Sequence, residues 1–380
     1  MSNGKTTDRI LSFLKREAMF AIALVAALIS LIITPPSDAL LLGINWKTLF
    51  LLFMLFTVLE GFKKEKLLEP IIIRATKIRK PFFLSLFLVL AVFILSSFIT
   101  NDVSLLAFVP ITILVFTRTE REKYIIPVIV LESIAANLGS LLTPFGNPQN
   151  LFLYDKMGIS GKDFILLMLP IYLLSLLLLV LALLFVFRKN MKDELVIKIE
   201  DIENGDRNKG MMMFYFCLLI FTLVGVLGYV NWLTIFIFFI ILILAFDRSV
   251  LKKVDWLLLA TFLCFFVFST SLSLNSRVNS FFSRIVSGHE FVSGLLLSQV
   301  ISNVPTAILL EPFSTNLEGL LYGVDVGGLG TLIASLASLI AFRLYSKGKG
   351  NDKGRFLIVF TLWNVVFLAF LIPLSLLLLS

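Results

Sequence analysis

The chain has 380 residues, of which 58% are hydrophobic, whereas soluble domains average about 45 to 50%. Only 15% are charged, and 33 basic residues outnumber 25 acidic ones. This composition excludes a water-soluble enzyme, a disordered chain and a coiled coil. It predicts an all-α polytopic membrane protein, because each membrane-spanning helix needs about 20 mostly apolar residues.

Eleven apolar runs follow one another along the chain, and most have the length of one span. The first follows a basic segment and precedes Pro35-Pro36, which predicts an uncleaved helix rather than a signal peptide. Cys217 and Cys264 lie inside apolar runs, so neither a disulfide nor a zinc site is expected. The runs cover 18–34, 48–62, 82–117, 124–154, 163–187, 211–229, 231–246, 254–274, 290–312, 319–342 and 356–379.

Polar residues interrupt three of these runs. The interruptions are Thr100-Asn101-Asp102 in run 82–117, Thr143 to Asn150 in run 124–154, and Ser302-Asn303 in run 290–312. Non-helical backbone at membrane depth must be surrounded by protein or line a water-filled cavity. We therefore expect re-entrant hairpins at 82–117 and 290–312, and discontinuous helices at 124–154 and 319–342.

The basic residues indicate the topology, because Lys and Arg collect on the cytoplasmic side of a membrane. If the two hairpins return to their own side and the other runs cross, 28 of the 33 basic residues are cytoplasmic and 5 are external. This predicts about nine crossing segments, with the N-terminus inside and the C-terminus outside. Hairpin 82–117 then enters from the cytoplasmic side and hairpin 290–312 from the external side.

The two halves of the chain share sequence patterns. Residues Ile99 to Ser104 align with Ile301 to Thr306, and Pro110 and Pro312 keep the same offset of 202. Farther on, Asn137 to Thr143 matches Asp325 to Thr331. These matches predict a first repeat over 1–187, a cytoplasmic linker over 188–210, and an inverted second repeat over 211–380. Secondary transporters built from inverted repeats bind their cargo at the repeat interface near the membrane midplane.

The interruptions supply suitable chemistry for ions. Free N–H groups at one helix end favour an anion, and free C=O groups at another favour a small cation. Thr, Ser and Asn add neutral oxygens and amide donors. Glycines at 139, 146, 327, 328 and 330 allow the sharp turns that expose main-chain carbonyls.

The stretch Ala136 to Asn150, with its Gly-Asn-Pro-Gln-Asn element, and the two polar tips resemble the ion transporter superfamily. That group includes divalent-anion:sodium symporters, citrate permeases, arsenite permeases and sodium/proton antiporters of the NhaD type. The resemblance spans nearly the whole chain. It implies a homodimer with an elevator-like motion of the hairpin domain.

The resemblance also implies the binding residues. One coupling ion is expected at Thr100, Asn101, Asp102, Gly139 and Asn147, and a second at Ser302, Asn303, Gly328 and Thr331. The substrate is expected to contact Asn101, Asp102, Ser104, Ser302, Asn303, Thr306 and Asn147. In the divalent-anion symporters both tips read Ser-Asn-Thr, but Asp102 and Val304 replace the threonines here, a departure that disfavours a dicarboxylate site.

We therefore expect a secondary active transporter for a small anion, a carboxylate or an oxyanion, coupled to Na⁺ or H⁺ and needing no other cofactor. The alternative is a cation/proton antiporter that uses Asp102. An enzyme is not expected, because the chain has one His and lacks HExxH and GxSxG motifs. The expected location is the cell inner (plasma) membrane, with lipid and a second copy as partners and no nucleic acid. For two further acids, Glu132 and Asp325, both a functional and a purely structural role are considered.

Overall fold

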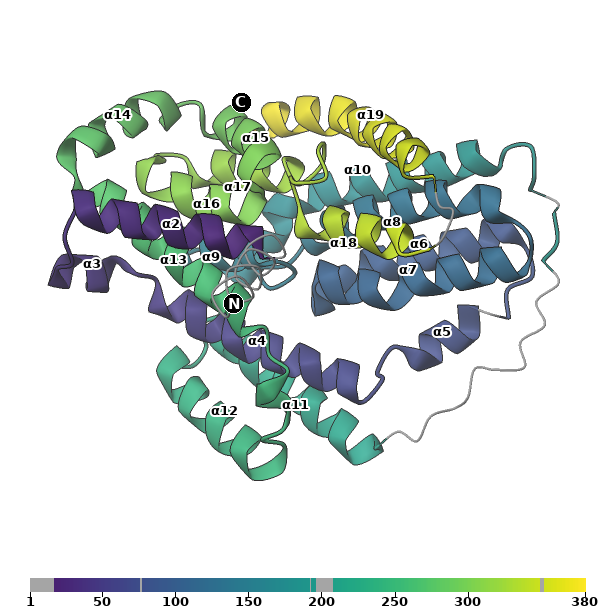
Figure 1. Ribbon diagram of the computed structural model, residues 1–380, viewed down its shortest axis with the longest axis horizontal. Coiled ribbons are helices and arrows are strands. Elements are labelled where there is room, and N and C mark those ends of the chain that lie inside the picture. The colour runs from purple at the N-terminus through teal and green to yellow at the C-terminus, as the bar shows by residue number, and fades with distance from the viewer. Residues whose placement is uncertain (1–16, 76, 192, 196–207, 349–351) are drawn as a thin grey trace, which may run out of the picture.

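The computed structural model describes residues 17–75, 77–191, 193–195, 208–348 and 352–380, and over these residues it contains helices and no strands (Figure 1). Seven of the described helical segments are long and apolar enough to cross a membrane, which makes the chain a multi-pass membrane protein. They are Pro81–Ile99, Asn101–Arg118, Glu122–Ser140, Gly161–Phe187, Lys209–Val226, Trp256–Leu274 and Lys353–Leu379.

The helices of the first half, in chain order, are α2 (Ala18–Ile33), α3 (Asp38–Gly43), α4 (Trp46–Lys64), α5 (Glu69–Ala75), α6 (Pro81–Ile99), α7 (Asn101–Arg118), η1 (Glu122–Tyr124), α8 (Ile125–Ser140), α9 (Pro148–Met157) and α10 (Gly161–Phe187). Those of the second half are α11 (Lys209–Val226), α12 (Trp232–Phe246), η2 (Val250–Lys252), α13 (Trp256–Leu274), α14 (Ser276–Val286), α15 (Glu290–Ile301), α16 (Asn303–Leu310), η3 (Glu311–Phe313), α17 (Leu317–Val326), α18 (Leu336–Ser346) and α19 (Lys353–Leu379). Much of the linker predicted over 188–210 lies outside the described residues.

Two polar interruptions are tight turns between helices. Thr100 separates α6 from α7, and Ser302 separates α15 from α16. The arms of the first hairpin have 19 and 18 residues, each as long as a span, whereas those of the second have 12 and 8. A polar tip therefore ends two long helices in one case and two short helices in the other.

Two further helices are interrupted. The first break lies between Ser140, where α8 ends, and Pro148, where α9 begins, so it starts earlier than the predicted Thr143. The second lies between the end of α17 at Val326 and the start of α18 at Leu336.

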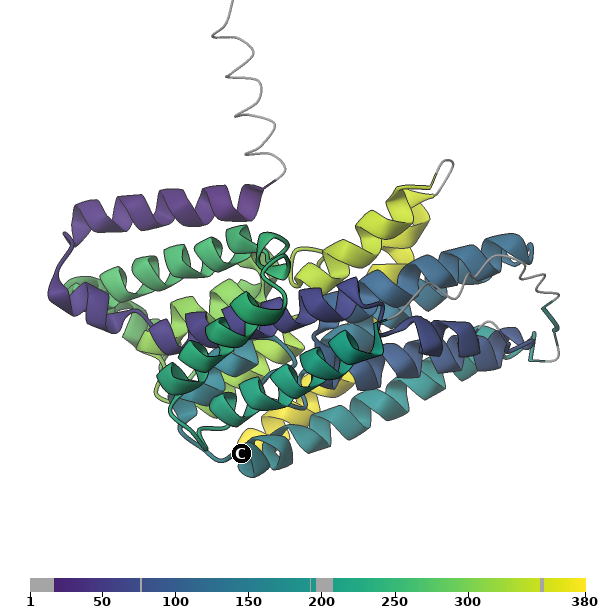
Figure 2. The same cartoon turned by 90° about the horizontal axis from the view of Figure 1, so that it is seen from below.

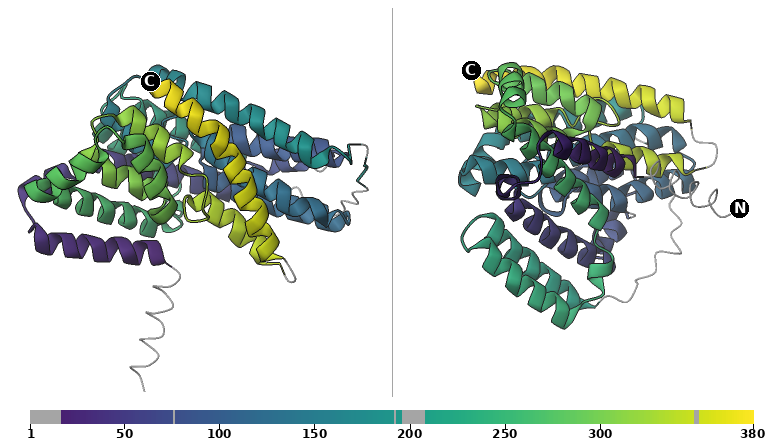
Figure 3. Two further views of the ribbon diagram at one scale, coloured as in Figure 1. Left: turned by 90° about the horizontal axis from the view of Figure 1, so that it is seen from above. Right: turned by 60° about the vertical axis from the view of Figure 1, so that its left-hand side comes forward.

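Helix α8 forms the centre of the molecule. It packs against α6, α7, α10, α18 and α19. Of the seven candidate spans, the one that contains α8 is the most buried, with 89% of it inside the protein. Helix α19 also lies along α10 (Figure 3). Gly139 allows α6 to approach α8, because a Cβ at this position would lie only 2.0 Å from the carbonyl oxygen of Phe93.

The remaining helices flank this centre. Helix α2 lies along α13 on the outside of the molecule (Figure 2), and Ser271 of α13 donates a 2.8 Å hydrogen bond to the carbonyl of Ser30. Short helices lie at the two ends, α5 at one and α3 and α14 at the other (Figure 1). The segment that forms α14 lies outside the apolar runs, yet it is helical because Asn275 caps the amides of Arg277 and Val278.

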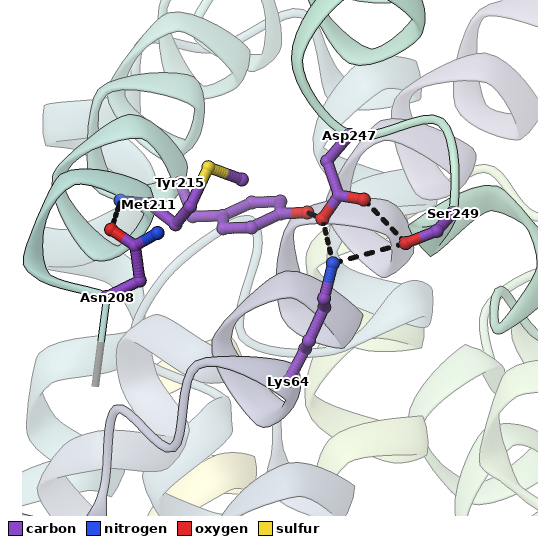
Figure 4. A network of polar contacts seen from close by, with 6 residues as sticks. All are labelled: Lys64, Asn208, Met211, Tyr215, Asp247 and Ser249. Atoms are coloured by element: carbon purple, nitrogen blue, oxygen red, sulfur yellow. Dashed lines mark hydrogen bonds and ion pairs between the residues drawn. The ribbon is translucent and has the colours of Figure 1, made fainter. Parts of the chain in front are cut away.

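A polar cluster joins α4 to α11 and to the loop after α12 (Figure 4). Lys64 pairs with Asp247 at 2.5 Å and also contacts Ser249, and the hydroxyl of Tyr215 donates to Asp247 at 2.7 Å. Burial of Asp247 opposes ionisation, but these hydrogen bonds and the charge of Lys64 outweigh it and lower the pKa of Asp247 from 3.8 to about 2. The ionised carboxylate of Asp247 thus holds α4, α11 and the loop after α12 together.

Candidate functional site

The first hairpin tip is a strained turn. Thr100 has φ 70° and ψ 148°, a region that residues with side chains seldom adopt. Its carbonyl accepts a bond from the hydroxyl of Ser104 at 3.2 Å, and the side-chain oxygen of Asn101 accepts the amide of Asp102 at 2.9 Å. One carboxylate oxygen of Asp102 is buried without a hydrogen-bond partner. Such local strain is concentrated at functional sites, which favours a binding role for this tip.

The second tip repeats this conformation. Ser302 has φ 76° and ψ 154°, its carbonyl accepts the hydroxyl of Thr306 at 2.8 Å, and the side-chain oxygen of Asn303 accepts the amide of Val304 at 3.0 Å. Ser302, Asn303 and Thr306 are all buried. Two sequences that share little beyond Ser/Thr-Asn thus adopt one backbone geometry.

Each helix break is tied to the hairpin beside it by the same pattern. At the first, Thr143 donates to the carbonyl of Ser97 at 2.5 Å, and Ser97 donates to the carbonyl of Gly139 at 2.8 Å. At the second, Thr331 donates to the carbonyl of Gln299 at 2.9 Å, and the Gln299 amide donates to the carbonyl of Gly327 at 2.9 Å. The hairpins therefore position the breaks.

Gln299 is a site residue that the sequence analysis missed. Its amide nitrogen also donates to the carbonyl of Leu329, and its amide oxygen accepts the N–H of Thr331 at 2.9 Å. The predicted ion ligand Thr331 is exposed and directs both its amide and its hydroxyl to Gln299. The offset of 202 that aligns the two tips also aligns Gln299 with Ser97. This alignment is the sequence signal from which Gln299 could have been predicted.

The second tip contacts the second break directly. The carbonyl of Ala334 accepts hydrogen bonds from the backbone N–H of Asn303 at 3.0 Å and from the hydroxyl of Ser302 at 3.4 Å. A Cβ at Gly328 would lie 2.9 Å from the side-chain amide nitrogen of Asn303. The structure thus brings together Ser302, Asn303 and Gly328, three of the four residues predicted for the second ion.

The two breaks contact each other through Asn137. Its side-chain oxygen accepts the hydroxyl of Ser335 at 2.6 Å, and its amide donates to Ser338 at 3.2 Å and to the carbonyl of Gly328 at 3.5 Å. Asn137 lies at the end of α8, just before the first break, whereas Gly328 and Ser335 lie in the second break and Ser338 follows it on α18. The residue is buried, with 6% of its surface exposed.

A reciprocal contact involves Asp325. Gln149 donates to one of its carboxylate oxygens at 3.0 Å, and the other oxygen is buried without a hydrogen-bond partner. Asn147 caps α9 by accepting the amide of Asn150, and it also donates to Ser140. Asp325 follows Asn137 by 188 residues, the same interval that separates Asn147 from Ser335 and Asn150 from Ser338.

Crossed packing brings the starts of four helices into this region. Helix α16 packs on α9, and α7 packs on α18. The helices begin at Asn101, Pro148, Asn303 and Leu336. No Lys or Arg occurs in the surrounding segments 96–104, 132–150, 298–306 and 325–338, so backbone N–H groups supply the positive ends there.

The oxygen atoms of the region are mostly neutral. Within the described residues there is no group of three or more His, Cys, Asp and Glu side chains that could hold a metal ion. Hydroxyls, amides and main-chain carbonyls remain, and such oxygens suit a hard cation better than a soft transition metal. The surrounding segments contain three acids, Asp102, Glu132 and Asp325.

Comparison with known proteins gives the family context. The model of a family described as "Citrate transporter" matches residues 10–319. An uncharacterized transporter of Methanocaldococcus jannaschii is 37% identical over 83% of this chain and 85% of its own length. The inner membrane protein YbiR of Escherichia coli is 34% identical over 69% of each chain, and a 46 kDa membrane protein of Mycobacterium leprae is 24% identical over 80% of this chain and 79% of its own.

Proposed function

This chain belongs to the citrate transporter family, and on that premise we propose that it moves a small anion, a carboxylate or an oxyanion, by secondary active transport coupled to Na⁺ or H⁺. It is a multi-pass transporter of the plasma membrane. The observation that carries the proposal is the crossed arrangement of two strained tips and two helix breaks. Inverted-repeat transporters hold their cargo between such elements.

The anion is proposed to bind where α7, α9, α16 and α18 begin. The backbone N–H groups of a helix start carry partial positive charge and bind carboxylates and oxyanions. The side-chain amides of Asn101, Asn303 and Asn147 add donors of the kind that orient an anion. Ser104 and Thr306 are proposed to contact it through their hydroxyl oxygens, since their O–H groups donate to the tip carbonyls. These segments contain no basic side chain, although Lys63 of α4 lines a cavity with Ile99 and Val103 beside the first tip, and co-bound cations are proposed to supply the remaining positive charge.

The coupling ions are proposed to bind at the two tips. Thr100, Asn101 and Asp102 with Gly139 and Asn147 form one site, and Ser302, Asn303 and Gly328 with Thr331 form the other. The equal backbone geometry of Thr100 and Ser302 supports a pair of related sites. Asp102 gives the first tip a carboxyl group with an unpartnered oxygen, and Val304 stands at the matching position of the second tip.

The topology is proposed from the charge distribution. An inverted second repeat, an internal N-terminus and an external C-terminus give the 28 to 5 division of basic residues. The open end of the first hairpin is consistent with it, since Lys80 precedes α6 and Arg118 ends α7. The homodimer and the elevator-like motion stay predictions that rest on the resemblance.

The alternative is exchange of a cation for protons through Asp102. The favouring observation is again the buried, unpartnered oxygen of this carboxylate. In vesicles, an antiporter would change internal pH when a cation is added and would need no anionic cargo. Asp102→Asn is expected to abolish that exchange, whereas in an anion symporter it is expected to uncouple uptake from the ion gradient.

A thermal-shift screen tests the proposal without knowing the substrate. Purified protein is heated with citrate, other carboxylates, arsenite or phosphate, each with and without Na⁺. A ligand that binds only the folded state raises the melting temperature in proportion to its occupancy. We expect one class of anion to stabilise the wild type and not Asn303→Ala. Stabilisation by cations alone would favour the antiporter.

A further inference from the structure

Glu132 is a buried acid outside the proposed ion sites. It lies on α8, five residues before Asn137, and none of its side chain is exposed. It is the one titratable residue of that helix, whose sequence is otherwise apolar or neutral. An ionisable side chain inside a membrane protein is costly and is usually retained for function.

Only one of the two carboxyl oxygens of Glu132 has a hydrogen-bond partner. The hydroxyl of Thr112, on α7, lies 2.5 Å from one carboxyl oxygen. The other oxygen is buried and has no hydrogen-bond partner. Thr112 is also fully buried, so the pair forms a small polar site between two helices.

No basic group within the described residues pairs with this carboxyl group. Among the elements packed on α8, α6 has no charged residue. The charged and titratable groups of the others are Asp102 and Arg118 on α7, Glu122, Lys123 and Tyr124 on η1, Lys162, Asp163 and Tyr172 on α10, Glu318, Tyr322 and Asp325 on α17, Arg343 and Tyr345 on α18, and Lys353 and Arg355 on α19. Even Arg118 lies six residues beyond Thr112, or about 9 Å along the helix.

A carboxylate in this position would be an ionised group with one hydrogen bond and no counter-charge. Taking such a group out of water costs many kcal/mol, and binding a proton removes most of that cost. We propose that Glu132 with Thr112 is a proton-binding site, separate from the hairpin tips. Thr112 follows Asn101 by eleven residues, so about 16 Å of helix separates this site from the first tip.

This inference extends the proposed function and rests on it only for its role in transport. If Glu132 takes up and releases its proton during each cycle, H⁺ is a coupling ion of the anion transporter. Its place on α8 suits that role, because the same helix carries Asn137, which contacts the second break.

Infrared spectroscopy of the purified protein tests the site directly. The carbonyl stretch of a protonated carboxyl group is distinct from the bands of a carboxylate. At neutral pH, the difference spectrum between the wild type and Glu132→Gln is expected to show the loss of one protonated carboxyl band. Asp163→Asn, which alters an exposed acid, is expected to leave that band unchanged.

Thr112→Val supplies a second variant that keeps the acid. Removing the hydroxyl is expected to shift the frequency of the Glu132 band without removing it, which a merely structural role would not do. The inference is overturned if Glu132→Gln loses only carboxylate bands. It is also overturned if the protonated carboxyl band has the same frequency in Thr112→Val as in the wild type.

A transport assay separates this inference from the proposed function. In vesicles that take up labelled citrate, Glu132→Gln is expected to keep citrate exchange and to lose accumulation driven by a pH gradient. Unchanged accumulation would refute the coupling role of Glu132. If the wild type takes up no anion while the infrared result holds, the proposed anion transport fails and the proton site stands.

Discussion

Ser335 donates a 2.6 Å hydrogen bond to the side-chain oxygen of Asn137, and the two residues come from different halves of the chain. Asn137 lies near the end of the first half of one broken helix, and Ser335 caps the second half of the other. Asp325 and Asn147 occupy the corresponding positions, and Asp325 accepts a 3.0 Å hydrogen bond from Gln149, two residues after Asn147. The two breaks therefore form one unit, in which displacing either changes the surroundings of both.

Asn137→Ala is expected to destabilise the folded protein. The substitution leaves Ser335, Ser338 and the carbonyl of Gly328 without this partner. A buried polar group left unsatisfied costs about 1 to 3 kcal/mol. The melting temperature in detergent measures this loss, with Asn279→Ala, which removes two half-buried hydrogen bonds, as the control. Equal melting temperatures for the two variants would show that the contact contributes little.

Gln299→Leu is expected to loosen the second break. The amide of Gln299 holds the carbonyls of Gly327 and Leu329 and the N–H of Thr331, and leucine provides none of these bonds. Amide hydrogen exchange should therefore speed up over residues 327–334 and not over 141–147. Ser97→Ala is the matched variant of the first break and should reverse that pattern. Uniform acceleration in both variants would contradict the local roles assigned to them.

Gly139→Ala is expected to separate α6 from α8. The new methyl group would lie 2.0 Å from the carbonyl oxygen of Phe93, a backbone atom that no rotamer change can move. Overpacking of a core costs about 1 to 3 kcal/mol or more. Gly354→Ala is the control, since its Cβ would meet its nearest neighbour at 3.5 Å. Wild-type yield and melting temperature for Gly139→Ala would rule out the close helix contact.

The sequence allowed the hairpins, the breaks and the Asn-containing tips to be located, because lipid penalises polar backbone and so restricts it to a few short segments. The repeat led to Ser302, Asn303 and Gly328, which lie together in the structure. It did not lead to Gln299, because an amide inside an apolar run is not conspicuous until the position of its partner break is known. The contacts of Asn137 were likewise hidden, since sequence alone does not give the crossed packing of the broken helices.

The polar cluster around Asp247 predicts acid sensitivity. Its pKa is lower in the folded protein than the ordinary value, so the ionised form stabilises the fold above about pH 4. That contribution is lost as the pH falls from about 4 to about 2. Melting temperatures measured across this range should fall for the wild type. Asp247→Asn should be less stable at neutral pH and should lack this part of the decrease, and an identical decrease in both proteins would assign it to other groups.

Uptake by reconstituted vesicles tests the central claim, that the paired tips and breaks bind and move an anion. Labelled citrate and other small anions are presented with an imposed Na⁺ gradient, with a pH gradient, and with neither. The account predicts that at least one anion accumulates only when a gradient is present, and that Asn101→Ala and Asn303→Ala each abolish the accumulation while the protein still folds. Accumulation without any gradient dependence, or cation-driven pH changes with no anion uptake, would contradict it.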